Sequence, residues 1–223
     1  GQVGSAHLDL QKVLSLDQDN VDALGLQTII AVVQNDKHAA MQLAEKAVQV
    51  HPNSSTALIA LSYAQQAAFD LEGARISLEK AVEIDSQNGL AWARLAELWS
   101  ASGRLDKSLD AAQKAEGMAP TLSRTQTVLG YAYLTKVETA KARDAFIKAI
   151  SFDQADPLPR LGLGLAIIRD GDLQAGSREI EIAASLDPNN SLIRSYLGKT
   201  YYEQKRPQLD GREYAIAKEL DPN

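Results

Sequence analysis

Two glycine-containing stretches are the first places to look for chemistry in this 223-residue sequence. Residues 197–200 read LGKT, which matches the end of a phosphate-binding loop, where backbone N–H groups and a lysine hold phosphates. That loop requires an earlier glycine at position 193, which is Ile193 here, and a strand before it. The LGLG at 161–164 lies in an expected helix and lacks the wider glycine pattern of a dinucleotide site. We therefore expect these glycines to serve close helix packing.

Metal and acid–base chemistry have equally little support. The histidines are His7, His38 and His51, and no two of them have the spacing of metal ligands on one helix. The chain has no cysteine, so disulfides and cysteine-ligated metals are impossible. Asp and Glu side chains are scattered over positions expected to face solvent. The sequence therefore predicts no metal, no cofactor and no catalytic residue, and a protein that is not an enzyme.

The two tryptophans, Trp92 and Trp99, suggest another kind of site. They are seven residues apart, so on a helix both rings lie on one face. Such a pair can line a ligand site, form an exposed binding hot spot or belong to a core. The choice depends on the elements that position the two rings.

A 34-residue period organises the chain. Short turn-like segments recur, and the third residue of each stands 34 positions from the next, six times without slippage. These residues are Gln18, Pro52, Ser86, Pro120, Gln154, Pro188 and Pro222. Alanine recurs in the same register at Ala47, Ala81, Ala115, Ala149, Ala183 and Ala217. Chance does not produce such a register, so internal repeats are the main signal of the sequence.

Each period divides into two amphipathic helical halves with turn residues between them. We predict first helices near 21–34, 55–68, 89–102, 123–136, 157–170 and 191–204. Second helices follow near 37–51, 71–85, 105–118, 139–152, 173–186 and 207–220, and a leading second helix occupies 3–17. Five of the six residues before the first helices are suited to N-capping, namely Asn20, Ser54, Asn88, Asp156 and Asn190, whereas Leu122 is not.

Two kinds of column explain how such helices pack. Small residues at one position of each first helix let the helix axes approach closely, and these are Thr28, Ser62, Ala96, Gly130, Gly164 and Gly198. The columns of Trp92 and Trp99 also hold large residues in other repeats, namely Leu24, Leu58, Tyr133, Ile167 and Tyr201. We therefore predict that both tryptophans pack in the core.

Composition agrees with packed helices and limits the classes of partner that we expect. Hydrophobic residues make up 45% of the chain but aromatics only 5%, which favours helices over a β-sandwich. The net charge is −6 and the pI about 5.1, whereas a surface that binds nucleic acid is normally basic. No stretch approaches the length of a membrane span. We therefore expect no nucleic-acid partner and no direct membrane insertion, and the sequence is compatible with both the cytoplasm and the periplasm.

The repeat resembles the tetratricopeptide repeat (TPR) family over nearly the whole chain. In 89–122 the family's order of large and small residues is followed by Trp92, Leu95, Ala96, Trp99, Ser108, Ala112 and Ala115. Gln126, Arg160 and Arg194 depart from it, because they replace the first large residue of their repeats. The resemblance implies an all-α fold, a right-handed α–α superhelical solenoid of stacked helix-turn-helix repeats.

We expect a single continuous solenoid domain. It consists of the second helix of a truncated leading repeat at 1–20 and of six repeats at 21–54, 55–88, 89–122, 123–156, 157–190 and 191–223. The chain lacks an initiator Met and begins GQVG, so we expect an excerpt of a longer bacterial repeat protein. An excerpt without capping helices is expected to self-associate through its uncapped ends.

The TPR resemblance implies that first helices line a concave groove for a peptide or partner protein. The predicted groove residues are Ile59, Tyr63, Glu97, Arg124, Tyr131, Leu134, Leu158, Leu161, Leu165, Ile168, Arg169, Lys199 and Tyr202. Leu158, Leu161, Leu165 and Ile168 form an apolar stripe at helical spacing, which is interpreted either as part of the groove or as inner-layer packing. TPR proteins of the sugar-transferase kind carry a ladder of asparagines along the groove. The matching column here contains no asparagine, and its residues are Leu26, Ala60, Arg94, Val128, Gly162 and Tyr196.

The predicted function is a non-catalytic protein–protein interaction scaffold that binds a peptide or partner segment in this groove. One alternative is a structural spacer or self-assembly element of a larger protein. Another is a domain that recruits partners for an enzyme outside this segment. The partner's identity is not written in the sequence.

Overall fold

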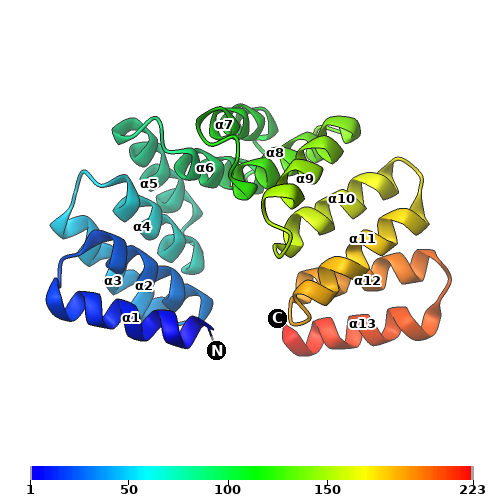
Figure 1. The fold of residues 1–223 in the computed structure, drawn as a ribbon, viewed down its shortest axis with the longest axis horizontal. Helices are drawn as coiled ribbons and strands as arrows, with labels where there is room; N and C mark the ends of the chain where they lie inside the picture. The colour runs from blue at the N-terminus through cyan, green and yellow to red at the C-terminus, as the bar shows by residue number, and fades with distance from the viewer. Residues whose placement is uncertain (1, 222–223) are drawn as a thin grey trace. The chain divides into compact units, whose positions relative to one another are not determined.

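The computed structural model describes residues 2–221, with side chains described from residue 4 onward, and these residues form thirteen α-helices and no strand. The helices are α1 Gln2–Leu16, α2 Val21–Val33, α3 Lys37–Val50, α4 Ser55–Ala67, α5 Leu71–Ile84, α6 Gly89–Ala101, α7 Leu105–Met118, α8 Ser123–Thr135, α9 Thr139–Phe152, α10 Pro157–Arg169, α11 Leu173–Leu186, α12 Ser191–Glu203 and α13 Pro207–Leu220 (Figure 1). The all-α repeat fold is thus confirmed, and each first helix ends one residue before its predicted end. Pro222, the last member of the proline column, lies outside the described residues.

The chain divides into two compact units, each described by itself. Unit 1 ends at Met118 and contains α1–α7, and unit 2 begins at Ala119 and contains α8–α13. Within each unit every helix packs against the next one in the chain, and the first helices also contact one another: α2 with α4, α4 with α6, and α8 with α10. These first helices therefore lie side by side, and the second helices pack against them. The 34-residue repeat boundaries and the single continuous domain stay predictions.

Helix caps explain where the first helices begin. The five predicted N-cap residues, Asn20, Ser54, Asn88, Asp156 and Asn190, each accept a backbone N–H of the first helical turn. Leu122, the sixth, makes no side-chain cap, as its type predicts. An aspartate caps the second helix in the same way at Asp36, Asp70 and Asp172. These side chains satisfy N–H groups that would otherwise have no partner at a helix start.

The turn after each first helix contains one residue with a left-handed backbone. Its members are Asn35, Phe69, Gly103, Val137, Gly171 and Lys205, with φ between 58° and 101°, and they follow the 34-residue period. This conformation is easy for Gly and tolerated by Asn, but it brings Cβ close to the backbone in a bulky residue. Phe69 and Val137 are therefore in a conformation that their side chains disfavour.

Small residues create the core of both units. Ala47, Ala81, Ala115, Ala149 and Ala183 are fully buried, which confirms that the alanine column lies where helices approach most closely. Trp92 and Trp99 are partly buried and pack against a core cluster that contains Leu58, Leu78 and Leu95. The indole N–H of Trp92 donates to the Ser86 carbonyl oxygen at 2.9 Å. Both tryptophans are thus packing residues, as their columns predict.

The core of unit 2 is built around Phe146, which is fully buried. Its ring lies against Gly130 and Gly162: a Cβ added at either glycine would come within 2.6 Å and 2.3 Å of the ring, respectively. Tyr131 meets the same ring edge-on, with centroids 5.0 Å apart. Gly198 lies in the middle of α12, where an added Cβ would meet the Tyr214 ring at 3.1 Å. The LGKT stretch is therefore helical, and its glycine serves packing.

Among the residues that the structure describes, no helix is both long enough and apolar enough to cross a membrane.

Candidate functional site: a basic, aromatic pocket on the first helices of unit 1

The predicted groove residues of unit 2 are mostly engaged in packing. Leu134 and Leu161 are buried in core clusters, and Leu165 and Ile168 are partly buried against the same clusters. Leu158 is half-buried, and its carbonyl oxygen accepts a hydrogen bond from the Tyr131 hydroxyl at 2.9 Å. Packing therefore accounts for Leu161, Leu165 and Ile168, and the assignment of this stripe to a groove stays a prediction.

The polar members of the set in unit 2 lie at separate places on their helices. Arg169 donates from Nη1 to the Leu134 carbonyl oxygen at 2.8 Å, near the end of α8, where the same oxygen also accepts the Val137 N–H. Arg124 is half-buried, and Lys199 and Tyr202 are exposed on α12. Burial raises the pKa of the Tyr131 hydroxyl well above its usual range, which keeps that group neutral. We therefore do not group these side chains into one site.

Unit 1 contains a better-formed candidate site around Arg94. This residue projects from α6, and only 6% of its surface is exposed. The guanidinium carbon lies 3.9 Å from the centroid of the Tyr63 ring on α4. Nη1 donates to Glu97 Oε2 at 3.0 Å, and Nη2 donates to Gln66 Oε1. Three side chains of the first helices, two of them predicted groove residues, thus hold one buried cation in place.

The Arg94 cluster forms one wall of an open pocket with a volume of about 470 Å³. Its lining comes from three consecutive repeats: Val32, Asn35 and Lys37 from the end of α2 and the start of α3, Tyr63, Gln66, Ala67 and Phe69 from the end of α4, and Arg94 from α6. We call these eight residues the Arg94 pocket. Ile59, the remaining predicted residue of unit 1, packs against the neighbouring core cluster instead.

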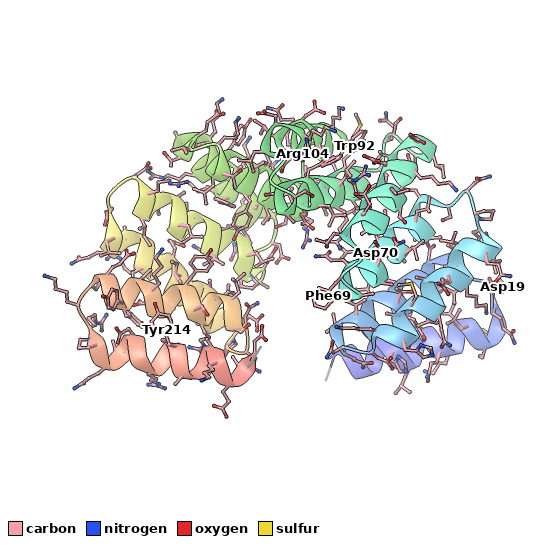
Figure 2. All side chains as sticks on the ribbon, turned by 180° about the vertical axis from the view of Figure 1, so that it is seen from behind. Asp19, Phe69, Asp70, Trp92, Arg104 and Tyr214 are labelled. Atoms are coloured by element: carbon pink, nitrogen blue, oxygen red, sulfur yellow. The ribbon has the colours of Figure 1, made fainter. Side chains whose placement is uncertain are left out.

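Phe69 is a largely exposed side chain of the Arg94 pocket. It follows α4 in the left-handed turn, and 82% of its surface is accessible. Figure 2 shows Phe69 and Asp70 together at this turn. The Lys37 ammonium lies 4.6 Å from the centroid of the Phe69 ring, which is within range of a cation–π contact. The pocket therefore combines two cations with two aromatic rings.

The sequence prediction included Tyr63 and Glu97 but missed Arg94, Lys37 and Phe69. Arg94 was visible as the only cation in a column that otherwise holds Leu, Ala, Val, Gly and Tyr. Phe69 was visible as the one aromatic residue in the turn column, where other repeats carry Asn, Gly, Val or Lys. Lys37 carried no such signal, because it becomes relevant only when the end of α2 meets the end of α4.

The arrangement is suited to binding and not to covalent chemistry. Hydroxyl, imidazole and carboxylate groups are not brought together in it as a nucleophile and a base. In the part of the chain that the structure describes, no group of three or more His, Asp or Glu residues is placed to hold a metal ion.

The fold defines the class: a helical repeat protein with the TPR fold. A thermophilic TPR protein from Thermus thermophilus has a TM-score of 0.70 and 19% identity, covering 76% of this chain and 93% of that one. The Cut9–Hcn1 hetero-tetramer of the APC/C has a TM-score of 0.70 and 16% identity, covering 100% of this chain and 52% of that one. Human IFIT1, in a dimer with m7Gppp-AAAA, has a TM-score of 0.80 and 16% identity, covering 98% of this chain and 55% of that one. At such identities the likeness establishes the fold alone.

Sequence comparison finds similarity to two larger proteins. Anaphase-promoting complex subunit 3 of Schizosaccharomyces pombe is 23% identical over 79% of this chain, and cellulose synthase operon protein C of Xanthomonas axonopodis pv. citri is 29% identical over 81%. The matches span only 27% and 10% of those relatives. No family model matches the chain.

Proposed function

We propose that this chain is a non-catalytic scaffold that binds a peptide or partner segment on the first helices. The observation that carries the proposal is the Arg94 pocket, which is lined by cationic and aromatic side chains from three consecutive repeats of unit 1. A repeat array presents such side chains on a rigid surface. The protein therefore loses little conformational entropy when a segment binds, which favours binding.

Site-specific photo-crosslinking to a bound peptide tests the proposal. Peptides that bind the chain are first selected from a random displayed library and then labelled. A photo-reactive amino acid is placed at Gln66 on first helix α4 and, as a control, at the exposed Ile76 on second helix α5. We expect labelled peptide to crosslink from position 66 and not from position 76. Selection of no binding peptide, or crosslinking from position 76 alone, would refute the proposal.

A self-assembly function is a second candidate, supported by exposed apolar side chains on α1. Leu8 and Leu16 are 59% and 90% exposed, although their helix is amphipathic. Light scattering over a range of concentrations separates the two functions. A binder keeps its molecular mass on concentration, whereas an assembly element grows and loses this growth when Leu8 and Leu16 are replaced by Glu.

A further inference from the structure

The side chains that line the Arg94 pocket indicate the chemistry of its occupant. The lining includes the cationic side chains of Lys37 and Arg94 but no carboxylate, in a chain whose net charge is −6. The acidic side chains nearby lie outside this lining: Glu97 pairs with Arg94, Asp36 accepts the Ala39 N–H at 3.0 Å, and Asp70 accepts the Gly73 N–H at 2.9 Å. The charged groups that an occupant of the pocket would contact first are therefore cationic.

Arg94 has donor capacity that the fold does not use. Its two terminal nitrogens are bonded to Glu97 and Gln66, yet its buried Nε–H has no acceptor. A buried donor without a partner costs free energy, so an acceptor that reaches this nitrogen would stabilise the site. The guanidinium plane is also held against the Tyr63 ring, which fixes its orientation before any ligand arrives.

Phe69 supplies the second, independent observation. Its backbone has a φ of 64°, although two hydrogen bonds of the turn, Phe69 N–H to Gln66 O and Asp70 N–H to Gln65 O, could be made equally well by Gly or Asn. The equivalent residue in the preceding repeat is Asn35, and in the following repeat it is Gly103. Val137 shares this φ, so the strain is not specific to the pocket. What distinguishes Phe69 is a largely exposed aromatic ring beside Lys37, and such a ring contributes little to the fold.

We infer that the Arg94 pocket recognises an acidic peptide segment that carries an aromatic or large apolar side chain next to its carboxylates. The apolar side chain packs on Phe69 and Val32, while carboxylates on either side approach Lys37 and the edge of Arg94. This inference rests on the proposed function and assigns to it the chemical class of the partner. Each kind of side chain in the pocket then has a counterpart in the ligand: the cations face carboxylates, and the aromatic ring faces an apolar side chain.

The test uses four fluorescein-labelled peptides of equal length and measures their binding by fluorescence anisotropy. One peptide is acidic with a central Phe, the second acidic with a central Ala, the third has Asn and Gln in place of Asp and Glu, and the fourth has Lys in their place. We expect the first peptide to bind roughly tenfold more tightly than the second or third, and the fourth not to bind. Raising the salt concentration should weaken the first peptide most, because its charge contacts are partly exposed.

Substitution of Phe69 separates binding from folding. Phe69→Asn copies the residue at Asn35 and suits the left-handed backbone, so the variant should unfold at the same denaturant concentration as the native chain or a higher one. Its affinity for the acidic Phe peptide should nevertheless fall about tenfold, because the exposed ring is lost. The matched control is Val137→Asn, at the same turn position of unit 2, which should not change this affinity.

Lys37→Gln tests the charge without touching the buried cluster, since Lys37 is exposed. It should weaken the acidic peptides about threefold to tenfold, whereas Lys199→Gln on the exposed surface of α12 should not. Arg94→Gln should abolish the preference for acidic over neutral peptides. If that variant fails to fold, Lys37→Gln and Phe69→Asn still decide the question.

The outcomes distinguish failure of this inference from failure of the proposed function. If the neutral or basic Phe peptide binds as tightly as the acidic one, or if Phe69→Asn keeps full affinity, the acidic–aromatic assignment is wrong while the scaffold function stands. If no peptide of any charge binds, the proposed function is wrong as well. A single-stranded RNA oligonucleotide is the last probe, and RNA binding that is lost on Arg94→Gln would overturn a peptide partner.

Discussion

In unit 1 the fourth position of each complete first helix holds Leu24, Leu58 or Trp92, whereas in unit 2 the same position holds Gln126, Arg160 or Arg194. The partner position, nineteen residues later on the second helix, changes with it. Leu24 packs beside Leu43 in unit 1, but in unit 2 Arg160 Nη1 lies 2.8 Å from Glu179 Oε2, and Arg194 Nη1 lies 2.8 Å from Glu213 Oε2. In these two repeats an ion pair therefore occupies the place where Leu24 and Leu43 pack in unit 1.

A second difference concerns volume. Unit 1 places Thr28, Ser62 and Ala96 in the small-residue column of the first helices, and unit 2 places glycine there in all three repeats. The glycines of unit 2 face larger side chains on the second helices: Phe146, Ile180 and Tyr214. In unit 2 a smaller residue on the first helix thus faces a larger side chain on the second helix, and the space between the two helices stays filled. One repeat pattern therefore permits two different cores.

The largest expected effect comes from Phe146→Ala. The ring fills the space that Gly130 and Gly162 leave, so its removal should lower the free energy of unfolding by about 3–5 kcal/mol. Urea unfolding followed by circular dichroism measures the change. In unit 1 the same register position already carries Ala112, and Ala112→Phe should instead overpack against the less permissive Ala96 column by about 1–3 kcal/mol. A small loss of stability on Phe146→Ala would show that the space beside Gly130 and Gly162 does not depend on the ring.

Gly162→Ala should destabilise unit 2 by about 1–3 kcal/mol, because the added methyl group meets the ring of Phe146. The control is Gly211→Ala, also inside a helix of unit 2, where an added Cβ meets no atom within 4 Å. There the better helix propensity of alanine should stabilise the chain by up to about 1 kcal/mol. Thermal unfolding of both variants should show shifts of opposite sign; equal shifts would contradict the packing explanation.

Glu213→Leu should cost about 1–3 kcal/mol, since Arg194 then loses its carboxylate in a partly buried site. The double variant Arg194→Leu with Glu213→Leu, which copies the Leu24 and Leu43 pair of unit 1, should recover most of this loss. A double-mutant cycle at low and high salt measures the coupling. Additive losses from the two single variants would mean that this ion pair contributes nothing specific to unit 2.

The smallest effect is expected at the helix starts. Leu122→Asn should stabilise the chain by about 0.5–1 kcal/mol, because Leu122 is the one predicted first-helix cap position whose side chain makes no cap. Asn88→Ala in unit 1 removes a cap that accepts the Ala91 N–H at 3.1 Å and should cost about 1 kcal/mol. Denaturant midpoints of the two variants should therefore move in opposite directions. A loss of stability in Leu122→Asn would indicate that its apolar side chain is needed where it lies.

The sequence alone determined the repeat, and it did so for a physical reason. Helix starts depend on local capping residues, and stacking of equal hairpins requires small and large residues at a constant period. Capping and stacking residues therefore recur at a fixed spacing in the sequence. Thirty-four-residue registers therefore predicted the helices almost to the residue, along with the caps and the packing role of Trp92 and Trp99. The same registers indicated that Arg160 and Arg194 depart from the pattern, although not that each has a glutamate partner.

Only the tertiary structure decided what surrounds each side chain. It buried Leu161 and Leu134, which a helical stripe cannot distinguish from groove residues, because periodicity records which face a residue occupies but not which neighbour covers it. It brought Lys37, Phe69 and Arg94 from three repeats into one pocket. The three residues occupy different positions of the repeat, so the 34-residue period does not predict that they meet. The architecture of this protein follows from local spacing, whereas its candidate site depends on contacts between repeats.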